Sequence, residues 1–301
     1  MINNLEHLIN LVSSFPKKVI AVAAAEDLEI LEVVEVAERM GLAEFILVGD
    51  KREIEHLALT HHKTTNFKII DEPDHQKAAE IAVKLVVDKE ADAVMKGLLH
   101  TSVFLKAILK KDGGLNIGKF ISQISIFEKP SGDGLMLLTD CALAISPNLE
   151  EKKNIIENAI GVAKIIGYQV PKIAILSAVE TINPEIKDTL DAAVLSKMAD
   201  RGQIKGGIVD GLFALDNAVS VEAAYHKGVK GEVAGRADIL IAPNLQVGNV
   251  IHKSITYFAC KDLASAIVGA GAPVIITSRT DTVRTKVLTI AFACYIAKSS
   301  V

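Results

Sequence analysis

The chain has 301 residues, half of them apolar, so it is long enough to form two domains with substantial cores and without disulfides or metals. Its formal net charge of −4 argues against a nucleic acid as partner, because binding a polyanion requires a dense surface of Lys and Arg. The three cysteines, Cys141, Cys260 and Cys294, are widely separated and lack CxxC spacing, which is typical of reduced thiols in a cytosolic protein.

The N-terminal residues carry no recognisable targeting signal. Residues 1–6 lack the basic-then-apolar order of a signal peptide. No apolar stretch reaches the roughly 20 residues that a membrane-spanning helix requires. We therefore expect a cytoplasmic protein that binds no membrane.

Short β-branched runs alternate with longer segments of helical periodicity along the first third of the chain. This order predicts an α/β fold with a mainly parallel sheet. The predicted strands are Val19–Ala24, Glu44–Val48, Phe67–Ile70 and Ala93–Met95, and the helices between them include Leu28–Met40 and Gln76–Val87.

The alternation is interrupted once. Ile124–Phe127 and Leu135–Leu138 flank a turn at Pro130–Gly134, a pattern that predicts an antiparallel hairpin and a domain boundary. Beyond Pro147 the pattern resumes with predicted strands at Ile173–Leu176, Gly207–Val209, Ile239–Ile241 and Val274–Thr277. A final helix, Thr282–Ala297, has more apolar surface than one face requires, so we expect it to return to the first domain. The predicted domains are 1–141 plus 282–301, and 142–281.

In a parallel α/β sheet, ligands bind beyond the carboxyl ends of the strands, so polar residues directly after strands are candidates for a site. The sharpest junction is Val274–Thr277 followed by Ser278, Arg279, Thr280 and Asp281. Arg279 can hold a phosphate or an oxyanion, Ser278 can donate a hydrogen bond, and Asp281 can accept a proton. Alternatively, Asp281 is an ordinary N-cap of the final helix.

A second junction follows Ile239–Ile241 and contains Asn244, Gly248, Asn249 and Lys253. Glycine allows a ligand to approach the backbone, and Lys253 lies about one helical turn after Asn249 on the same side. This arrangement suits an anionic ligand at the start of a helix, although such junctions are also common connectors.

A third junction, after Ala93–Met95, contains Lys96, Gly97, His100 and Thr101, with Lys106 one turn into the next helix. We expect Thr101 or Ser102 to cap that helix and Lys106 to reach back to an anion. His100 taken alone is more typical of a structural residue.

The fourth junction carries two carboxylates, Asp210 and Asp216, on either side of an apolar loop. They either line an acyl or pantetheine pocket or act as acid and base.

Several nucleotide-binding and hydrolase motifs are absent from the sequence: GxxxxGK[ST], a GxGxxG opening a helix after the first strand, GxSxG and HExxH. The eight histidines are scattered, and none shares a helix face with another His or a Cys at metal spacing. The sequence therefore predicts no bound metal.

Nine phrases carry a resemblance to a known family. They are Met95–Leu98, Leu138–Ala142, Leu190–Ala193, Ser196–Gly206, Val209–Gly211, Phe213–Ala218, Ala242–Asn244, Val247–Val250 and Thr277–Asp281. On these phrases the chain resembles the phosphate acetyl- and butyryltransferases along nearly its whole length, and the length and the Phe213–Asn217 phrase favour the butyryl branch.

The resemblance implies reversible transfer of a short acyl group between coenzyme A and phosphate, by direct thiolate attack in a ternary complex. It implies a two-domain fold similar to isocitrate and isopropylmalate dehydrogenases, with the active site in the interdomain cleft. It also implies that coenzyme A is a substrate, that no cofactor is tightly bound, and that the protein forms a homodimer or higher homo-oligomer. We expect Ser278, Arg279 and Asp281 to be catalytic. Substrate would be bound by Lys96, Gly97, His100, Thr101, Lys106, Asp140, Asp210, Asp216, Asn244, Gly248, Asn249 and Lys253.

The sequence departs from the family pattern at several positions. An ungapped alignment puts Thr285 where the acetyltransferase branch is expected to have its base, so Asp281 is assigned by proximity alone. Lys106 stands where Arg is common, which keeps the charge but loses the bidentate fork. Leu212 replaces a common Pro, and His252 replaces a common Tyr.

Other interpretations stay open on the sequence alone. Cys141 follows a strand and invites an acyl-enzyme mechanism, but no His is placed by the sequence to activate it, so a packing role is favoured. Acetyl transfer is the nearest alternative to butyryl transfer. A metal- and NAD-dependent hydroxyacid dehydrogenase would use Asp210 with Asp216, and a non-catalytic sensor of coenzyme A or acyl phosphate would need no base.

Overall fold

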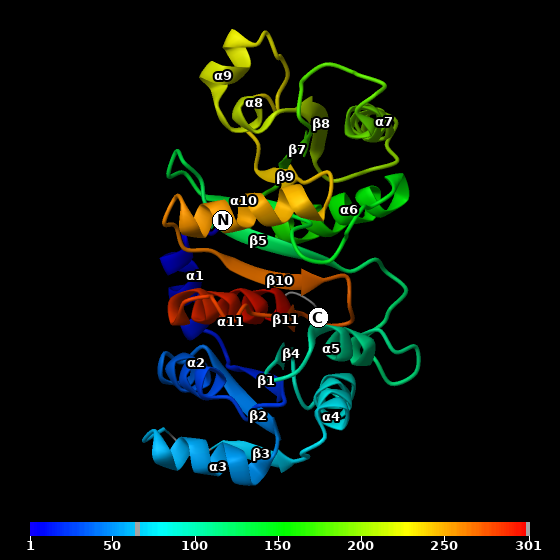
Figure 1. Cartoon of the computed structure of the whole chain (residues 1–301). Helices are drawn as coiled ribbons and strands as arrows, with labels where there is room; N and C mark the ends of the chain where they lie inside the picture. Colours follow the sequence, from blue (N-terminus) through cyan, green and yellow to red (C-terminus); the bar gives the residue numbers. More distant parts are fainter. Residues whose placement is uncertain (64–66, 299–301) are drawn as a thin grey trace. The chain divides into compact units, whose positions relative to one another are not determined.

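The computed structural model describes residues 1–63 and 67–298, which form two compact α/β units (Figure 1). Unit 1 consists of Met1–Asn4 and Phe120–Leu263, and unit 2 consists of Leu5–Lys119 and the chain from Ala264 onward. Each unit has its own set of hydrogen-bonded strands and its own buried core.

Unit 2 contains a sheet in the order β3-β2-β1-β4-β11-β10. All its neighbouring strands are parallel except β10 and β11, which are antiparallel. The strands are β1 (Lys18–Ala23), β2 (Ala43–Gly49), β3 (Lys68–Asp71), β4 (Ala93–Lys96), β10 (Ala264–Val268) and β11 (Val274–Ile275). The helices are α1 (Leu5–Ser13), α2 (Leu28–Arg39), α3 (Lys51–Thr60), α4 (His75–Val87), α5 (Thr101–Ile108) and α11 (Val283–Lys298).

Unit 1 contains a sheet in the order β5-β6-β9-β7-β8. Its strands are β5 (Ser122–Glu128), β6 (Leu135–Thr139), β7 (Lys172–Leu176), β8 (Ile208–Phe213) and β9 (Ile239–Ile241). Only the β5–β6 hairpin is antiparallel. The helices are α6 (Leu149–Ile165), α7 (Lys187–Asp200), α8 (Leu215–Val219), α9 (Val221–His226) and α10 (Leu245–Tyr257).

The predicted α/β class, the parallel strands and the hairpin are confirmed. Two details differ. Strand β10 was not predicted, because Ala264, Ser265 and Ala266 have weak strand preference and only pairing within the sheet selects the extended form. Strand β11 ends at Ile275, so Ile276 and Thr277 already belong to the loop that follows it.

The unit boundaries lie at 4/5, 119/120 and 263/264, whereas the sequence predicts boundaries at 141/142 and 281/282. The pairing of strands explains the difference. The β5–β6 hairpin joins β9 in unit 1, while β10 and β11 pair with each other and β11 continues onto β4 in unit 2.

Helix α11 is buried on almost every side, as its apolar sequence predicts, and packs against α1, α2 and β10. Even Lys286 is only 4% exposed, and its ammonium nitrogen lies 2.6 Å from Glu29 Oε2. This helix therefore anchors the C-terminal part of the chain in unit 2.

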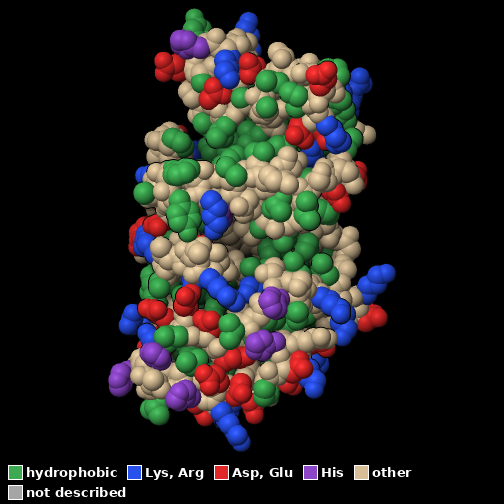
Figure 2. All heavy atoms as spheres, viewed as in Figure 1, with side chains coloured by type: hydrophobic (Ala, Val, Ile, Leu, Met, Phe, Trp, Pro, Cys, Tyr) green, Lys and Arg blue, Asp and Glu red, His purple; other side chains and the backbone are tan. Residues whose placement is uncertain are grey.

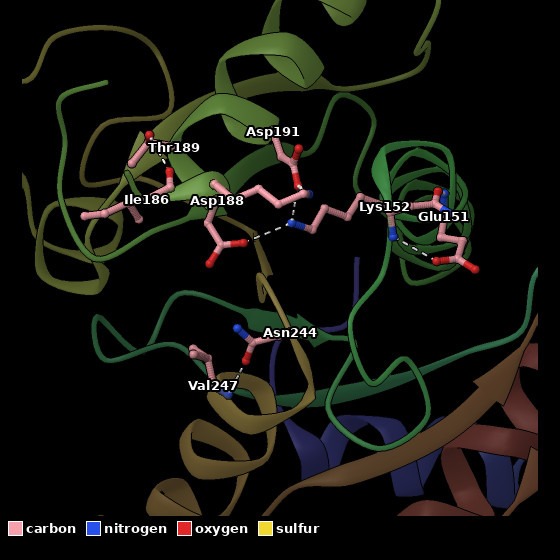
Figure 3. A network of polar contacts seen from close by, with 10 residues as sticks. Glu151, Lys152, Ile186, Asp188, Thr189, Asp191, Asn244 and Val247 are labelled. Atoms are coloured by element: carbon pink, nitrogen blue, oxygen red, sulfur yellow. Dashed lines mark hydrogen bonds and ion pairs between the residues drawn. The ribbon is translucent and has the colours of Figure 1, made fainter. Parts of the chain in front are cut away.

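A buried ion-pair network joins α6 to α7 in unit 1 (Figure 3). Lys152 is 2% exposed, and its Nζ donates to Asp188 Oδ1 at 3.2 Å and to Asp191 Oδ2 at 2.8 Å. Lys187 donates to the same Asp191 oxygen at 2.5 Å. Because a buried charge is costly without a partner, these contacts fix α7 on α6.

The surface drawn in Figure 2 mixes acidic and basic side chains over unit 2, and His side chains gather there as well. No continuous basic area is visible on that face of the described residues, in keeping with the net negative charge. Among the described helices, none has both the length and the apolarity to cross a bilayer.

Candidate active site

The parallel pairing of β4 with β11 brings two of the predicted junctions together in unit 2. Val94 pairs with Val274, and Met95 pairs with Ile275. Both strands therefore end at the same edge of the sheet, where Lys96 is the last residue of β4 and Gly97 follows it. Ser278 and Arg279 lie in the loop after β11.

Lys96 is half-buried at this edge, and its Nζ donates to the carbonyl oxygens of Gly97 and Leu99, each at 3.0 Å. Burial lowers the pKa of Lys96, the nearby Arg279 guanidinium lowers it further, and Asp27 opposes both effects. Arg279 is exposed and has no ion pair among residues 1–63 and 67–298. Two neighbouring cations with so little compensation form a site suited to an anion.

Gly97 lies against the backbone of the loop that follows β1. Its N–H donates to Ala23 O at 2.8 Å, and the Leu98 N–H donates to Ala24 O at 2.6 Å. A Cβ atom at position 97 would lie 2.1 Å from Ala24 O and 2.7 Å from Ala23 O. Only glycine fits here, so this contact sets the position of the Lys96 loop.

The loop from Ser278 to Asp281 is closed on itself. Asp281 Oδ2 accepts from the Ser278 N–H at 2.8 Å, and the Asp281 N–H donates to Ser278 O at 3.1 Å. The hydroxyls of Ser278 and Thr280 are 3.0 Å apart. The N-cap alternative for Asp281 is wrong, because Thr282 Oγ1 accepts from the Thr285 N–H at 3.1 Å and caps α11.

Thr285, the position that the alignment offered as a base, is 5% exposed and exchanges hydrogen bonds with Thr282. At α5 the expected cap by Thr101 or Ser102 is wrong. His100 occupies the N-cap position without a side-chain cap bond, and Thr101 is the first helical residue. His100, Thr101 and Lys106 are all exposed.

In unit 1 the carboxyl ends of β6 and β9 lie side by side, since Thr139 pairs with Ile241. Asp140, directly after β6, is 3% exposed. Its Oδ1 accepts from the N–H groups of Ala142, Leu143 and Ala144 at 2.7, 2.7 and 3.2 Å, and its Oδ2 accepts from the Gln123 N–H at 2.8 Å. Four backbone donors occupy this carboxylate, so Asp140 shapes the loop.

Helix α10 begins against that same loop. Asn244 caps it by accepting from the Val247 N–H at 3.0 Å. Gly248 lets the backbones meet, because a Cβ there would lie 2.1 Å from Asp140 O. Asn249 Nδ2 donates to Cys141 O at 3.4 Å, and Lys253 follows one turn later on the helix.

A cluster of polar side chains surrounds Cys141, and sequence reasoning missed it. Ser125 Oγ lies 3.2 Å from Cys141 Sγ and 3.0 Å from His252 Nδ1, and His252 Nδ1 lies 3.8 Å from the sulfur. The sequence places no His to activate Cys141, whereas the fold brings His252 beside it. Burial raises the pKa of the Cys141 thiol to about 12, although the Ser125 hydrogen bond opposes the shift.

Asp210 and Asp216 occupy different surroundings. Asp210 lies in β8, where burial raises the pKa of its carboxyl although the Gly211 N–H donates to Oδ1 at 2.8 Å. Asp216 lies in α8, and its ion pair with Lys227 at 3.0 Å lowers the pKa of its carboxyl. Within the described parts of the chain, no three acidic, imidazole or thiol groups converge on a point suited to a metal ion.

Residues 56–294 match the family model described as phosphate acetyl/butaryl transferase. The chain is 48% identical over 298 residues to the phosphate butyryltransferase of Clostridium acetobutylicum, covering 99% of each chain. A crystal structure of a branched-chain phosphotransacylase from Enterococcus faecalis V583 superposes with a TM-score of 0.83 at 32% identity, covering 93% of this chain and 99% of that one.

The predicted likeness to dehydrogenases is also found at the level of the fold. A structure described as a putative 4-hydroxythreonine-4-phosphate dehydrogenase from Salmonella typhimurium superposes with a TM-score of 0.56 at 14% identity, covering 93% of this chain and 100% of that one. Identity this low supports a shared fold and carries nothing about substrates.

Proposed function

Since the chain belongs to the phosphate acetyl/butyryltransferase family, we propose that it transfers a butanoyl group reversibly between coenzyme A and inorganic phosphate. In the direction of thioester synthesis, the coenzyme A sulfur forms a bond to the acyl carbon and the bond from that carbon to the phosphate oxygen breaks. Phosphate leaves with the electron pair, and the thiol proton passes to a base.

The observation that carries this proposal is the meeting of Lys96 and Arg279 at the carboxyl ends of β4 and β11. Arg279 is exposed and without an ion pair among the described residues, so its planar fork is available to a phosphate group. Ser278 adds a hydroxyl beside it. These groups would bind the phosphate in the ground state and stabilise the charge that develops on it during transfer.

Asp281 is our assignment for the base. Its Oδ2 holds the Ser278 N–H, so the carboxylate stays within the loop that carries Arg279. A base fixed so close to the phosphate-binding groups would take the thiol proton as the sulfur attacks.

Direct transfer is favoured over an acyl-enzyme intermediate. A nucleophilic cysteine has to be a thiolate, and burial raises the pKa of Cys141 to about 12 although the Ser125 hydrogen bond opposes the shift. Cys141 also packs in a cluster of buried apolar side chains with Phe127, Met136 and Leu138. A neutral, enclosed thiol suits packing.

For coenzyme A we propose contacts with Asn244, Gly248 and Asn249 at the start of α10 and with Lys253 farther along the helix. The first turn of α10 carries no acidic side chain, and a helix start attracts phosphate groups. His100, Thr101 and Lys106 are proposed for the remaining phosphate contacts. Asp210, whose pKa is raised, and Asp216 would line the part that receives pantetheine or the acyl chain. Asp140 would act indirectly by holding the 141–144 loop.

We further propose that coenzyme A is a substrate with no tightly held cofactor, that the protein works in the cytoplasm, and that it forms a homodimer or higher homo-oligomer. Exposed apolar side chains on α7 and α10 support self-association. They are Leu190, Val194, Val250 and Tyr257, at 38, 45, 64 and 59% exposure.

The first test is phosphate-dependent release of thiol from acetyl-, propionyl- and butyryl-coenzyme A. We expect the highest kcat/KM with butyryl-coenzyme A. Acetyl transfer is the second candidate, because the family description covers both and one methylene is worth only about 1–3 kcal/mol of selectivity. Absence of thiol release with all three would refute the proposed function.

The site itself is tested by Arg279→Ala, which should lower kcat/KM by about tenfold or more. Arg284→Ala is the matched control, since Arg284 belongs to the same unit and its ion pair with Glu6 is exposed. Equal activity of the two variants would remove Arg279 from the site.

A further inference from the structure

A pocket of about 460 Å³ lies in unit 1, away from the residues of the candidate active site. Its lining includes Lys129, Lys172, Arg236 and Asp238 together with apolar side chains such as Met136. Lys172 begins β7 and Asp238 directly precedes β9, so the pocket lies at the amino ends of these parallel strands. Asp140 and Asn244 lie at the opposite ends, and the five residues of β7 alone span roughly 16 Å.

The pocket carries a local excess of positive charge. Asp238 is already used, because Oδ1 lies 2.6 Å from Lys129 Nζ and Oδ2 accepts from the Lys172 N–H at 2.8 Å. The other lining acid, Asp133, accepts a hydrogen bond from Ser131 within the hairpin turn. The ammonium of Lys172 and the guanidinium of Arg236 have no ion pair among residues 1–63 and 67–298.

The loop that carries Arg236 is held in place on both sides. The Gly235 N–H donates to Asn217 O at 2.8 Å, and the Ala237 N–H donates to Ala218 O at 3.2 Å. Gly235 has φ +69°, and a Cβ at this position would lie 2.4 Å from the Val221 backbone. Position 235, in this wall of the pocket, therefore accepts only glycine. A preformed wall lowers the entropic cost of binding a ligand.

We propose that this pocket binds a small phosphate monoester with an apolar substituent. Arg236 and Lys172 supply the charge and the hydrogen bonds that a phosphate group requires. Met136, Val219 and Val221 supply an apolar wall for the substituent. The volume lies within the range of roughly 300–1,000 Å³ that is usual for small-molecule sites, and it exceeds what inorganic phosphate alone would fill.

Phenyl phosphate is a suitable probe, and calorimetric titration of the full-length protein measures its binding. Arg279→Ala protein serves as the parent, because it lacks the guanidinium of the candidate active site. In that background, Arg236→Glu and Lys172→Glu should each weaken binding by roughly tenfold or more. Arg201→Glu, an equal charge reversal at an exposed Arg of unit 1 outside the pocket, should leave the affinity unchanged.

Arg236→Gln removes the charge with a smaller structural change, and it replaces Arg236→Glu if the latter lowers the melting temperature. Retained binding in the parent and loss in both pocket variants would support the proposal. It is overturned if the parent does not bind phenyl phosphate, if the pocket variants bind as the parent does, or if Arg201→Glu weakens binding equally.

Discussion

Replacement of Gly97 by alanine tests whether the position of the Lys96 loop controls activity. The new Cβ would lie 2.1 Å from Ala24 O, where ordinary contacts begin at 3.4 Å, so the two backbones have to separate by about 1.3 Å. The opposing atoms are backbone, which has no rotamer to change. Overpacking of this kind costs about 1–3 kcal/mol of stability, and a misplacement of about 1 Å at a catalytic site costs about a hundredfold in rate.

We therefore expect Gly97→Ala to fold, to melt at a lower temperature, and to lose about a hundredfold in kcat/KM for butyryl-coenzyme A. Thiol release measures the rate, and circular dichroism measures the melting. Gly161→Ala is the matched control, since Gly161 lies within α6 and a Cβ there meets nothing within 4 Å. Alanine in a helix interior should stabilise by about 0.5–1 kcal/mol and leave activity unchanged.

A Gly97→Ala protein with the kcat/KM of the unmodified enzyme would show that the position of the Lys96 loop does not control activity. A loss of activity only in proportion to the fraction unfolded would contradict the prediction as well, because the effect would then arise from stability and not from the position of the loop.

Three further predictions concern charged groups. Because burial and Arg279 hold the pKa of Lys96 below its usual value, the affinity for phosphate should fall as pH rises through that lowered pKa. Calorimetry in two buffers should detect proton uptake on binding, and the Lys96→Arg protein should keep its phosphate affinity to higher pH. A phosphate affinity of the unmodified protein that does not change at alkaline pH would contradict this role of Lys96. In unit 1, Lys152→Met should lower the free energy of unfolding by about 3 kcal/mol in a urea titration, because Asp191 loses its buried partner. Lys197→Met removes only an exposed ion pair, so it should lower the free energy of unfolding by less than about 1 kcal/mol in the same measurement. Burial raises the pKa of Asp191, but Lys152 and Lys187 outweigh this effect and lower the pKa overall. The contribution of Asp191 to the free energy of unfolding is therefore complete above about pH 4 and is lost as pH falls through the lowered pKa. If the Lys152→Met protein lost as much stability in acid as the unmodified protein, the result would count against the ion pair.

Local patterns in the sequence were sufficient to predict the class of fold and the polar junctions that follow the strands. Strands such as β1, β2 and β9 are visible because their apolar runs are short and bounded by turns, which depends only on neighbouring residues. The hairpin of β5 and β6 is visible for the same reason, since its turn residues lie between the two strands.

The outcomes for single polar residues depended on partners far away in the sequence. Asp140 looked like a ligand of the substrate, yet Gln123 and the 142–144 backbone occupy its carboxylate. No His is placed beside Cys141 by the local sequence, yet His252 Nδ1 lies 3.8 Å from its sulfur.

The candidate anion site shows the same division between sequence and structure. The sequence by itself determined that Lys96 and Arg279 each follow an apolar strand, because hydrophobic periodicity is a property of adjacent residues. Only the tertiary structure decided that β4 and β11 are neighbours, since strand pairing is chosen by packing over the whole sheet and leaves no local trace in either segment. That pairing brings two separate cations together in the proposed phosphate site.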